Sequence, residues 1–512
     1  MTQPSGRAGV VAVIRRHAPV VVVCSIVFVI GLAWALSNPP GAAPDEPSHY
    51  VRMVGLSQGD VRGADLPPDY LVDLGFEPGP KEYRLRVEAG LYRIPGAAPP
   101  PTFCNRFQPQ QPWTCTLPPA VPGTIEAMSM HARVQPLPYV VPAVFSLFAD
   151  STNQKLYLGR FGFLLQNTLL VGLIVVAMRR VIVAPWLLNA ALLSMVVTPL
   201  LAFQIGTLAP NATETLAIAA FAAWLLAFLR TPSRRLLVGA AALGCVGLLT
   251  RDLGPLLVPS VAVLVFVATP DARAALRSNG RRPLLVAGGS MAAAFVAAVL
   301  WRVANAGPLG DLDLTVAHVR HELWSLGFIA RSSVSLVGSL DVSLDRWASM
   351  LWLVLLGVVT ALRAGRSRRS WCVVLAAALL WTAVNVVVAI TTEAAGYGNQ
   401  ARYTLVIPIV MALCLVSRAG SWPLPRWAAW ATFVVALGVA AVQHLAIIVI
   451  NAQRHANGLN GTPISFSDPV WAPAFGWRLP LTIAAIGTAW FVGGVVWLTW
   501  AAGRDQPPNE NT

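Results

Sequence analysis

Residues Asn38–Gly59 read NPPGAAPDEPSHYVRMVGLSQG and follow directly on the first long apolar run of the chain. Two acids, Asp45 and Glu46, stand side by side where the chain leaves that run. Pro47 has no backbone N–H to donate, so it fits the first turn of a helix, and Asp45 before it can cap the free N–H groups of that turn. We therefore expect a short helix over residues 47–58.

This short helix brings chemically useful side chains together. Asp45, His49 and Arg52 fall at positions i, i+4 and i+7, which places a carboxylate, an imidazole and a guanidinium on one side. Such a set is typical of acid/base chemistry and anion binding. The alternative is that Asp45 only caps the helix and that the other side chains form a solvated face. The helix should end at Gly59, since glycine readily adopts the left-handed conformation found after a helix.

The rest of the chain has the composition of a membrane protein. Of its 512 residues, 56% are hydrophobic and 12% are charged, with a mean hydropathy of +0.62, whereas soluble domains carry about 25% charged residues. Apolar runs of about 20 residues, the length that crosses a bilayer, recur from end to end. We predict an all-α integral membrane protein with about twelve transmembrane helices, over Ala18–Leu36, Leu156–Met178, Val181–Phe203, Thr213–Leu229, Leu236–Thr250, Leu253–Ala268, Pro283–Val303, Trp347–Leu362, Trp371–Ile390, Tyr403–Val416, Trp427–Ile450 and Leu479–Ala501.

The basic residues give this bundle an orientation. With the N-terminus inside, the predicted cytoplasmic segments hold 19 of the 37 basic residues and only three acids, as the positive-inside rule requires. We therefore expect both tails, residues 1–17 and 502–512, in the cytoplasm, and the loop over residues 37–155 outside. The net charge of +14 reflects this topology and contact with anionic lipid head groups, and it gives no support to nucleic-acid binding.

The long first loop, residues 37–155, is rich in proline and shows no clean strand alternation. We expect it to lie over the outer mouth of the bundle rather than to fold as a separate domain. Its last part, a short apolar stretch ending at Phe148, is too brief to span and is expected to form an interfacial helix. The loop also holds Cys104 and Cys115, the only cysteine pair outside the predicted spans, which we predict to form a disulfide.

Charged residues near the membrane mark a candidate site. They are costly unless they are paired, face a wet cavity or reach the interface, and five of them map to the predicted outer side: Arg160, Glu214, Arg251, Asp252 and Arg402. The arginines can instead simply extend to outer lipid head groups. We expect these residues to join the two acids after the first span in one outward-facing polar site.

Other motifs give little support to metal or soluble nucleotide chemistry. His318 and His321 lie three residues apart in a second outer loop, but they lack the HExxH spacing of zinc enzymes, so a solvated amphipathic helix is the favoured interpretation. The sequence has no Walker loop, no strand-linked GxGxxG motif and no GxSxG motif.

Several motifs together resemble a bacterial family of polytopic proteins, domain-of-unknown-function family 2142, over nearly the full length of the chain. That family is itself similar to the GT-C superfamily of membrane glycosyltransferases. The resembling segments are Pro44–His49 with Arg52 and Gly59, His131–Tyr139, Leu156–Arg160, Thr198–Pro199 with Asn211–Glu214, and Gln400–Tyr403 with Pro408. The chain departs from the family pattern at Asn211-Ala212, where Pro-Asp is usual, and at Ala401, where Gly is usual.

The resemblance implies a GT-C-like catalytic region over residues 18–416, followed by C-terminal helices within 417–501. In GT-C enzymes the acidic pair of the first outside loop lies at the active site, and the donor is a sugar on a polyprenyl phosphate. The implied function is transfer of a hexosyl or pentosyl group, with inversion, to an acceptor hydroxyl outside the bacterial plasma membrane. The implied partners are the lipid-linked sugar, a glycan, glycolipid or protein acceptor, and the bilayer. No cofactor is firmly predicted, and a divalent cation is the one candidate.

The residues suit this chemistry. An acceptor hydroxyl must lose its proton as it attacks, which calls for a carboxylate within reach, while arginines can bind a leaving phosphate through two hydrogen bonds. We predict Asp45 and Glu46 as catalytic residues. The predicted substrate-binding residues are His49, Arg52, His131, Arg160, Arg251, Asp252, Gln400, Arg402 and Tyr403.

Two other functions fit a twelve-span protein. A transporter or flippase for a lipid-linked glycan would move its substrate without changing it, but such proteins often carry internal repeats and polar groups near the bilayer midplane. The sequence shows no repeat between its halves, and its membrane charges lie near the predicted outer ends of the spans. A structural partner in an envelope-assembly complex would leave the polar residues unexplained.

Overall fold

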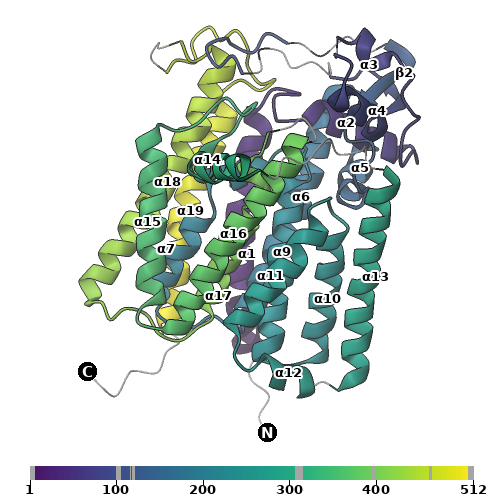
Figure 1. The fold of residues 1–512 in the computed structure, drawn as a ribbon. Coiled ribbons are helices and arrows are strands. Elements are labelled where there is room, and N and C mark those ends of the chain that lie inside the picture. The colour runs from purple at the N-terminus through teal and green to yellow at the C-terminus, as the bar shows by residue number, and fades with distance from the viewer. Residues whose placement is uncertain are drawn as a thin grey trace.

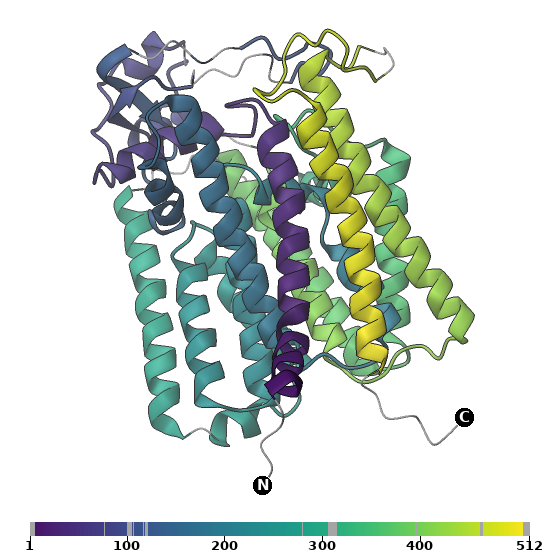
Figure 2. The same ribbon diagram turned by 180° about the vertical axis from the view of Figure 1, so that it is seen from behind.

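A computed structural model describes residues 6–75, 77–99, 105, 107–115, 117, 121–278, 280–305, 315–394, 398–460 and 464–504. Long helices stand side by side in a bundle, and a layer of short helices and two strands covers one end of it, the loop end (Figure 1). The start of α1 (Gly6–Ser37) and the end of α19 (Arg478–Arg504) both lie at the opposite end. The start of α1 and the end of α19 therefore share one side of the bundle (Figure 2). Which side faces the cytoplasm stays a prediction.

The bundle contains fewer full-length spans than the sequence predicts. Its further helices are α6 (Thr152–Met178), α7 (Trp186–Val196), α8 (Pro199–Ile205), α9 (Asn211–Arg230), α10 (Arg234–Leu248), α11 (Gly254–Ala268), α12 (Ala272–Ser278), α13 (Arg281–Asn305), α15 (Arg346–Ala364), α16 (Arg368–Ala394), α17 (Val406–Val416) and α18 (Arg426–Ala456). Among the described residues, eight helices are long and apolar enough to cross a membrane, or up to ten if each of two bent pairs counts as one span. The predicted count of twelve is not confirmed.

The difference from twelve lies in two short helices. α10 has 15 residues and α17 has 11, and at about 1.5 Å per residue α10 reaches only about 22 Å, less than the ~30 Å of a hydrocarbon core. The span predicted over Val181–Phe203 is also broken, because α7 and α8 meet at a bend of 63°. Pro199 begins α8, and the Thr198 hydroxyl caps it by accepting from Leu201 N at 3.4 Å. A new helix therefore starts inside the apolar run.

α9 forms the centre of the bundle. It contacts α6, α10, α11 and α17, and 94% of its most apolar stretch is buried, compared with 17% for α13. Its sequence is rich in alanine, and small residues let neighbouring helices approach closely. α1 packs beside α6 on one flank and α19 on the other (Figure 2). This packing places the end of α1, and the chain that follows it, against α6.

The layer at the loop end is more regular than the sequence suggests. It contains α2 (Glu46–Ser57), α3 (Tyr70–Asp73), α4 (Pro80–Glu88), β1 (Gly90–Gly96), β2 (Val121–Ser129), η1 (Leu137–Tyr139) and α5 (Val140–Ser146). β1 and β2 pair antiparallel, with Gly90 opposite Ser129 and Tyr92 opposite Ala127. Both strands contain glycine and proline, so neither shows the alternation of apolar and polar residues that predicts a strand. The predicted Cys104–Cys115 disulfide involves Cys104, which lies outside the described residues, so it stays a prediction.

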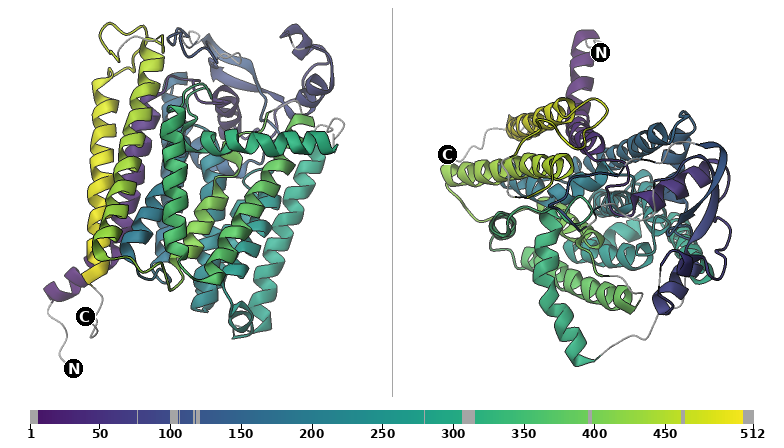
Figure 3. Two further views of the ribbon diagram at one scale, coloured as in Figure 1. Left: turned by 60° about the vertical axis from the view of Figure 1, so that its left-hand side comes forward. Right: turned by 90° about the horizontal axis from the view of Figure 1, so that it is seen from above.

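The layer shares its core with the bundle. Tyr50, Tyr92 and Tyr139 pack in one buried cluster with Leu156 and Phe163 of α6. Two further elements complete the loop end: α14 (Val316–Ser335) lies crosswise to the bundle helices (Figure 3), and η2 (Ala401–Tyr403) joins α16 to α17. α14 contacts both α16 and η2.

Candidate functional site

The helix predicted after the first span is present as α2, and Gly59 follows it with a φ of +85°. The start of α2 differs from the prediction. Asp45 adopts the left-handed conformation, with a φ of 61°, and its side chain makes no capping hydrogen bond. The expectation that Asp45 caps the helix is therefore wrong. Its carboxylate instead accepts a hydrogen bond from Arg402, 357 residues later in the sequence.

A fully buried ion pair fixes the first turn of α2. Arg160 of α6 donates from Nε to Glu46 Oε1 and from Nη2 to Glu46 Oε2, both at 2.7 Å, and neither side chain is exposed. Arg160 also donates to the backbone carbonyls of Ala35, Asn38 and Pro39. One guanidinium thus joins α6, the end of α1 and the start of α2.

The Glu46 carboxylate has further partners in the backbone. Oε2 accepts from Gly41 N at 2.9 Å, and Oε1 accepts from Leu208 N at 3.3 Å. A buried carboxylate with this many donors is well satisfied where it is. The structure therefore separates the two adjacent acids, since Glu46 points into the protein.

Asp45 faces the polar side of the loop end. Arg402 of η2 donates from Nη2 to Asp45 Oδ2 at 2.7 Å, and His131 Nε2 lies 3.9 Å from the same oxygen. About a quarter of the Asp45 side chain is exposed. Burial favours a higher pKa for this carboxyl, but Arg402 and His131 outweigh burial and hold the pKa well below its usual range. Asp45 is therefore an ionised carboxylate with a cation beside it.

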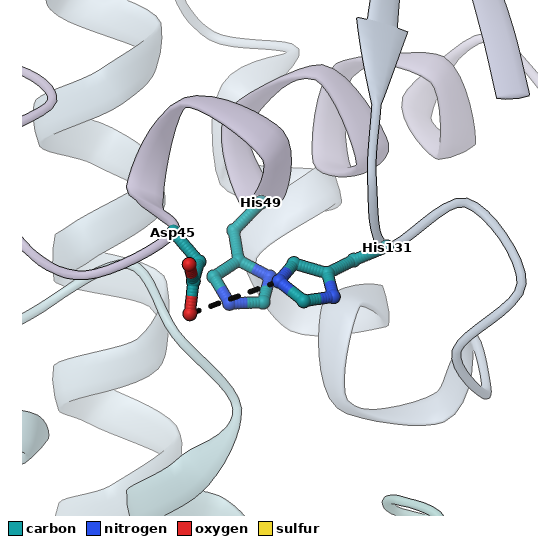
Figure 4. Close-up of side chains that lie close together, drawn as sticks. All are labelled: Asp45, His49 and His131. Atoms are coloured by element: carbon teal, nitrogen blue, oxygen red, sulfur yellow. Dashed lines mark ion pairs between the residues drawn. The ribbon is translucent and has the colours of Figure 1, made fainter. Parts of the chain in front are cut away.

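Two histidines stack next to Asp45 (Figure 4). The rings of His49 and His131 lie 4.4 Å apart with only 12° between their planes. His49 Nδ1 is 2.7 Å from the Tyr139 hydroxyl. Burial, and then the charge of His131, hold the pKa of His49 well below its usual value, so His49 is a neutral ring at pH 7. The hydrogen bond to Tyr139 fixes the orientation of that ring.

Arg251 completes a pair of cations around Tyr403. The guanidinium carbons of Arg251 and Arg402 lie 5.7 and 5.6 Å from the centre of the Tyr403 ring. Arg251 also hydrogen-bonds to the Asn211 side-chain oxygen and lies 3.6 Å from Glu214 Oε2 at the start of α9. Each arginine is thus held by an acid, and the two share one aromatic ring.

The other predicted site residues have different polar contacts. Arg52 is buried and donates to Tyr92 Oη at 2.5 Å and to Val134 O at 2.6 Å, so it supports β1 and the chain before η1. Asp252 accepts from Arg302 at 2.9 Å. Gln400 precedes η2, and its side-chain oxygen is buried with no hydrogen-bond partner in the part of the chain that the structure describes. The Arg52 guanidinium also lies 5.9 Å from the centre of the Tyr139 ring, whose hydroxyl contacts His49, so the predicted part of Arg52 in the site stays a prediction.

Asp45, His49 and His131 also offer three ligand atoms within 4.8 Å of one another. Two features make this group a poor metal site. Arg402 already neutralises Asp45, and the near-parallel rings direct their nitrogen lone pairs in parallel planes rather than toward one point. The arrangement favours an ion pair between Asp45 and Arg402.

Sequence reasoning left two residues out of the predicted site. Tyr139 orients His49, and its position at the end of the segment His131–Tyr139 was the available signal. Asn211 binds Arg251, although it stands where the family usually has proline. Tyr139 contacts His49, and Asn211 contacts Arg251. Both partners are distant in sequence, so these contacts form only in the folded chain.

The fold and the site together define a many-spanning membrane protein with a cluster of ionised and aromatic side chains at one end of its helix bundle. The model of the family described as predicted membrane protein (DUF2142) matches residues 28–413, and the chain belongs to this family. A comparison with curated proteins found no match.

Among solved structures, the chain is similar to ArnT from Cupriavidus metallidurans. The crystal structure of ArnT bound to undecaprenyl phosphate is 16% identical, with a TM-score of 0.42, over 95% of this chain and 78% of ArnT. The apo structure gives the same identity and TM-score over 97% of this chain and 77% of ArnT.

Proposed function

We propose that the protein is a membrane glycosyltransferase of GT-C type, which moves a sugar from a polyprenyl-phosphate donor to a hydroxyl of a cell-envelope acceptor outside the plasma membrane. One observation carries the proposal. The Asp45 carboxylate lies 2.7 Å from Arg402, and Arg402 and Arg251 contact the same Tyr403 ring. A carboxylate beside two guanidinium groups offers both a base for the acceptor and a binding site for a phosphate.

The donor phosphate would compete with Asp45 for Arg402. Arg402 uses Nη2 for Asp45, while its Nε is buried and has no hydrogen-bond partner among the described residues. A phosphate oxygen would satisfy this donor. The sugar donor is a phosphodiester with one negative charge, as a carboxylate has, and the leaving polyprenyl phosphate gains further charge as its bond to the sugar breaks. Binding of the donor would thus draw Arg402 away from Asp45 and raise the proton affinity of the Asp45 carboxylate, since its neighbouring cation is then shared.

The reaction balances with these groups alone. The acceptor oxygen forms a bond to the anomeric carbon while the bond from that carbon to the phosphate oxygen breaks. The acceptor proton passes to Asp45, and polyprenyl phosphate leaves with the electron pair and is held by Arg251 and Arg402. Attack from the face opposite the phosphate inverts the anomeric centre. His49 and His131 lie beside Asp45, where they would contact the acceptor.

Glu46 and Arg160 are positioning residues in this proposal. Both are fully buried and satisfied, so neither touches a substrate. They hold the turn that gives Asp45 its left-handed backbone and thereby orient its carboxylate.

The test is sugar transfer by the purified full-length protein in proteoliposomes. The donors are radiolabelled polyprenyl-phosphate hexoses and pentoses, and the acceptors are envelope glycan, glycolipid and protein fractions. We expect label to move to one acceptor fraction, and Asp45→Asn to lower the rate by about 100-fold or more. Asp69→Asn, at an exposed acid of the same layer that makes no capping bond, is the matched control. Transfer by Asp45→Asn at the rate of Asp69→Asn would remove Asp45 from the chemistry.

A lipid-linked-glycan transporter remains the second candidate, because two helix pairs are broken, at bends of 63° and 104°. Broken helices are common in transporters, where they line sites near the bilayer midplane. The same proteoliposomes distinguish the two functions. A transporter moves labelled donor across the membrane with its covalent structure intact, whereas a transferase yields labelled acceptor and free polyprenyl phosphate.

A further inference from the structure

The loop end holds a second group of metal-ligating side chains, outside the site described above. His318 and Glu322 lie one turn apart on α14, and Glu393 lies in the last turn of α16. One ligand atom from each of the three lies within 4.8 Å of the other two. His318 Nε2 and Glu393 Oε2 are 3.2 Å apart. The sequence drew attention to His318 and His321, at positions i and i+3. In the structure His318 instead lies next to Glu322, at position i+4 on the same helix.

The charges in this group favour a cation. Glu322 is only 8% exposed, and among the described residues its side-chain donor is Ser325, whose hydroxyl lies 3.3 Å from Oε2. Within the described part of the chain, the ion pairs of Glu322 and Glu393 include no lysine or arginine; Glu393 pairs with His318. Two carboxylates at this separation repel each other, and an imidazole offsets at most one charge, and only when protonated. Glu393 adds its charge at the carboxyl end of α16, where the helix dipole is already negative.

We propose that His318, Glu322 and Glu393 bind one divalent transition-metal ion such as Zn²⁺. One imidazole and two carboxylates form a donor set that zinc and manganese accept, whereas Ca²⁺ and Mg²⁺ prefer oxygen ligands alone. Tetrahedral zinc with bonds of about 2.0–2.2 Å holds its ligand atoms about 3.4 Å apart. The distance between His318 and Glu393 already matches this spacing, and one carboxylate oxygen of Glu322 lies within 4.8 Å of both ligand atoms.

The ion would join two elements next to the site. α14 contacts η2, which carries Arg402, and the chain between Glu393 and Arg402 is short. A metal at this point would hold α14 against the end of α16 and steady the segment that presents the arginine. Its role is positioning. Binding of the ion does not depend on the proposed sugar transfer, so the two proposals can fail separately.

The experiment measures Zn²⁺ binding to the full-length protein in detergent, purified with a tag free of histidine and stripped with a chelator. Isothermal titration with Zn²⁺ should give about one site per chain, and Co²⁺ should give the visible absorption of a tetrahedral site. Glu322→Gln and His318→Gln should each weaken binding by about 10-fold or more. His321→Gln changes an exposed histidine of the same helix and should bind as the unaltered protein does.

Two results would overturn the proposal. The first is no saturable Zn²⁺ or Co²⁺ binding by the unaltered protein, whose folding is checked by thermal unfolding. The second is binding that survives Glu322→Gln and His318→Gln but is lost in His131→Gln, which would place the ion at Asp45, His49 and His131. Zn²⁺ should also raise the unfolding temperature of the unaltered protein more than that of Glu322→Gln, since an ion that binds only the folded state stabilises it.

Discussion

Arg402 and Asp45 are separated by 357 residues in sequence and joined by a hydrogen bond of 2.7 Å. The pair connects η2, between the late helices α16 and α17, to the start of α2. In the proposed function a donor phosphate binds the same guanidinium, so this contact would couple donor binding to the state of the carboxylate. The first prediction tests that coupling.

Arg402→Lys should lower transfer by about 30–100-fold and raise the KM for the polyprenyl-phosphate donor. Lysine keeps the charge but offers a single point donor in place of the planar guanidinium, so it cannot bind the carboxylate and a phosphate through separate N–H groups. The measurement is kcat and KM over a range of donor concentrations. Arg93→Lys, at an arginine that is 81% exposed in a surface ion pair, is the control. A donor KM unchanged by Arg402→Lys would show that the donor phosphate binds elsewhere.

Glu46→Gln should destabilise the protein by about 3 kcal/mol, because it leaves the Arg160 charge buried without its carboxylate. The measurement is the unfolding midpoint in detergent, with transfer expressed per folded molecule. Glu126→Gln removes an acid that is 61% exposed, 3.6 Å from Arg93, and should change stability by no more than about 0.5 kcal/mol. Loss of transfer without loss of stability in Glu46→Gln would instead give Glu46 the catalytic role that the sequence suggested.

Acid should destabilise the protein through His49. The folded state holds the pKa of His49 well below its usual value, whereas in the unfolded chain its pKa is about 6.5. Below that pH the unfolded state binds the extra proton, so stability falls with falling pH by up to about 1.4 kcal/mol per pH unit. Asp45, whose pKa is also depressed, loses its contribution only below about pH 4.

Unfolding midpoints measured from pH 7.5 to 5 should therefore fall less steeply for His49→Gln than for the unaltered protein. His321→Gln, at an exposed histidine, should leave the slope unchanged. Equal slopes in all three proteins would mean that His49 is not held neutral by its surroundings.

Gly206→Ala should destabilise the protein, because a Cβ at this position would lie 2.3 Å from Gly31 O and 2.8 Å from Trp34 Cβ. Backbone atoms cannot move aside without shifting α1 away from the end of α8. Gly288→Ala, where a Cβ would meet nothing within 4 Å, should be neutral or stabilising by up to about 1 kcal/mol. The two unfolding midpoints decide the prediction. Similar midpoints would show that α1 and α8 are less closely packed than described.

Local sequence features predicted the elements that depend on neighbouring residues. Pro47 and Gly59 marked the ends of α2 within one or two residues, because a missing N–H and a left-handed φ act on the backbone at those positions alone. The apolar runs predicted a membrane protein for a similar reason, since the length of a run depends only on neighbouring residues. Their number was not confirmed, since run length does not reveal where Thr198 caps a new helix or where α10 stops short.

By itself the sequence determined that the protein spans a membrane and that its few charged residues near the apolar runs mark a site, because charge in an apolar chain needs a partner. The tertiary structure alone decided which acid of the pair faces that site. Adjacent residues at the start of a helix point in different directions, and only the packing of α1, α6 and η2 directs Glu46 to Arg160 and Asp45 to Arg402. These partners come from distant parts of the chain, so no local sequence pattern predicts the contacts between them.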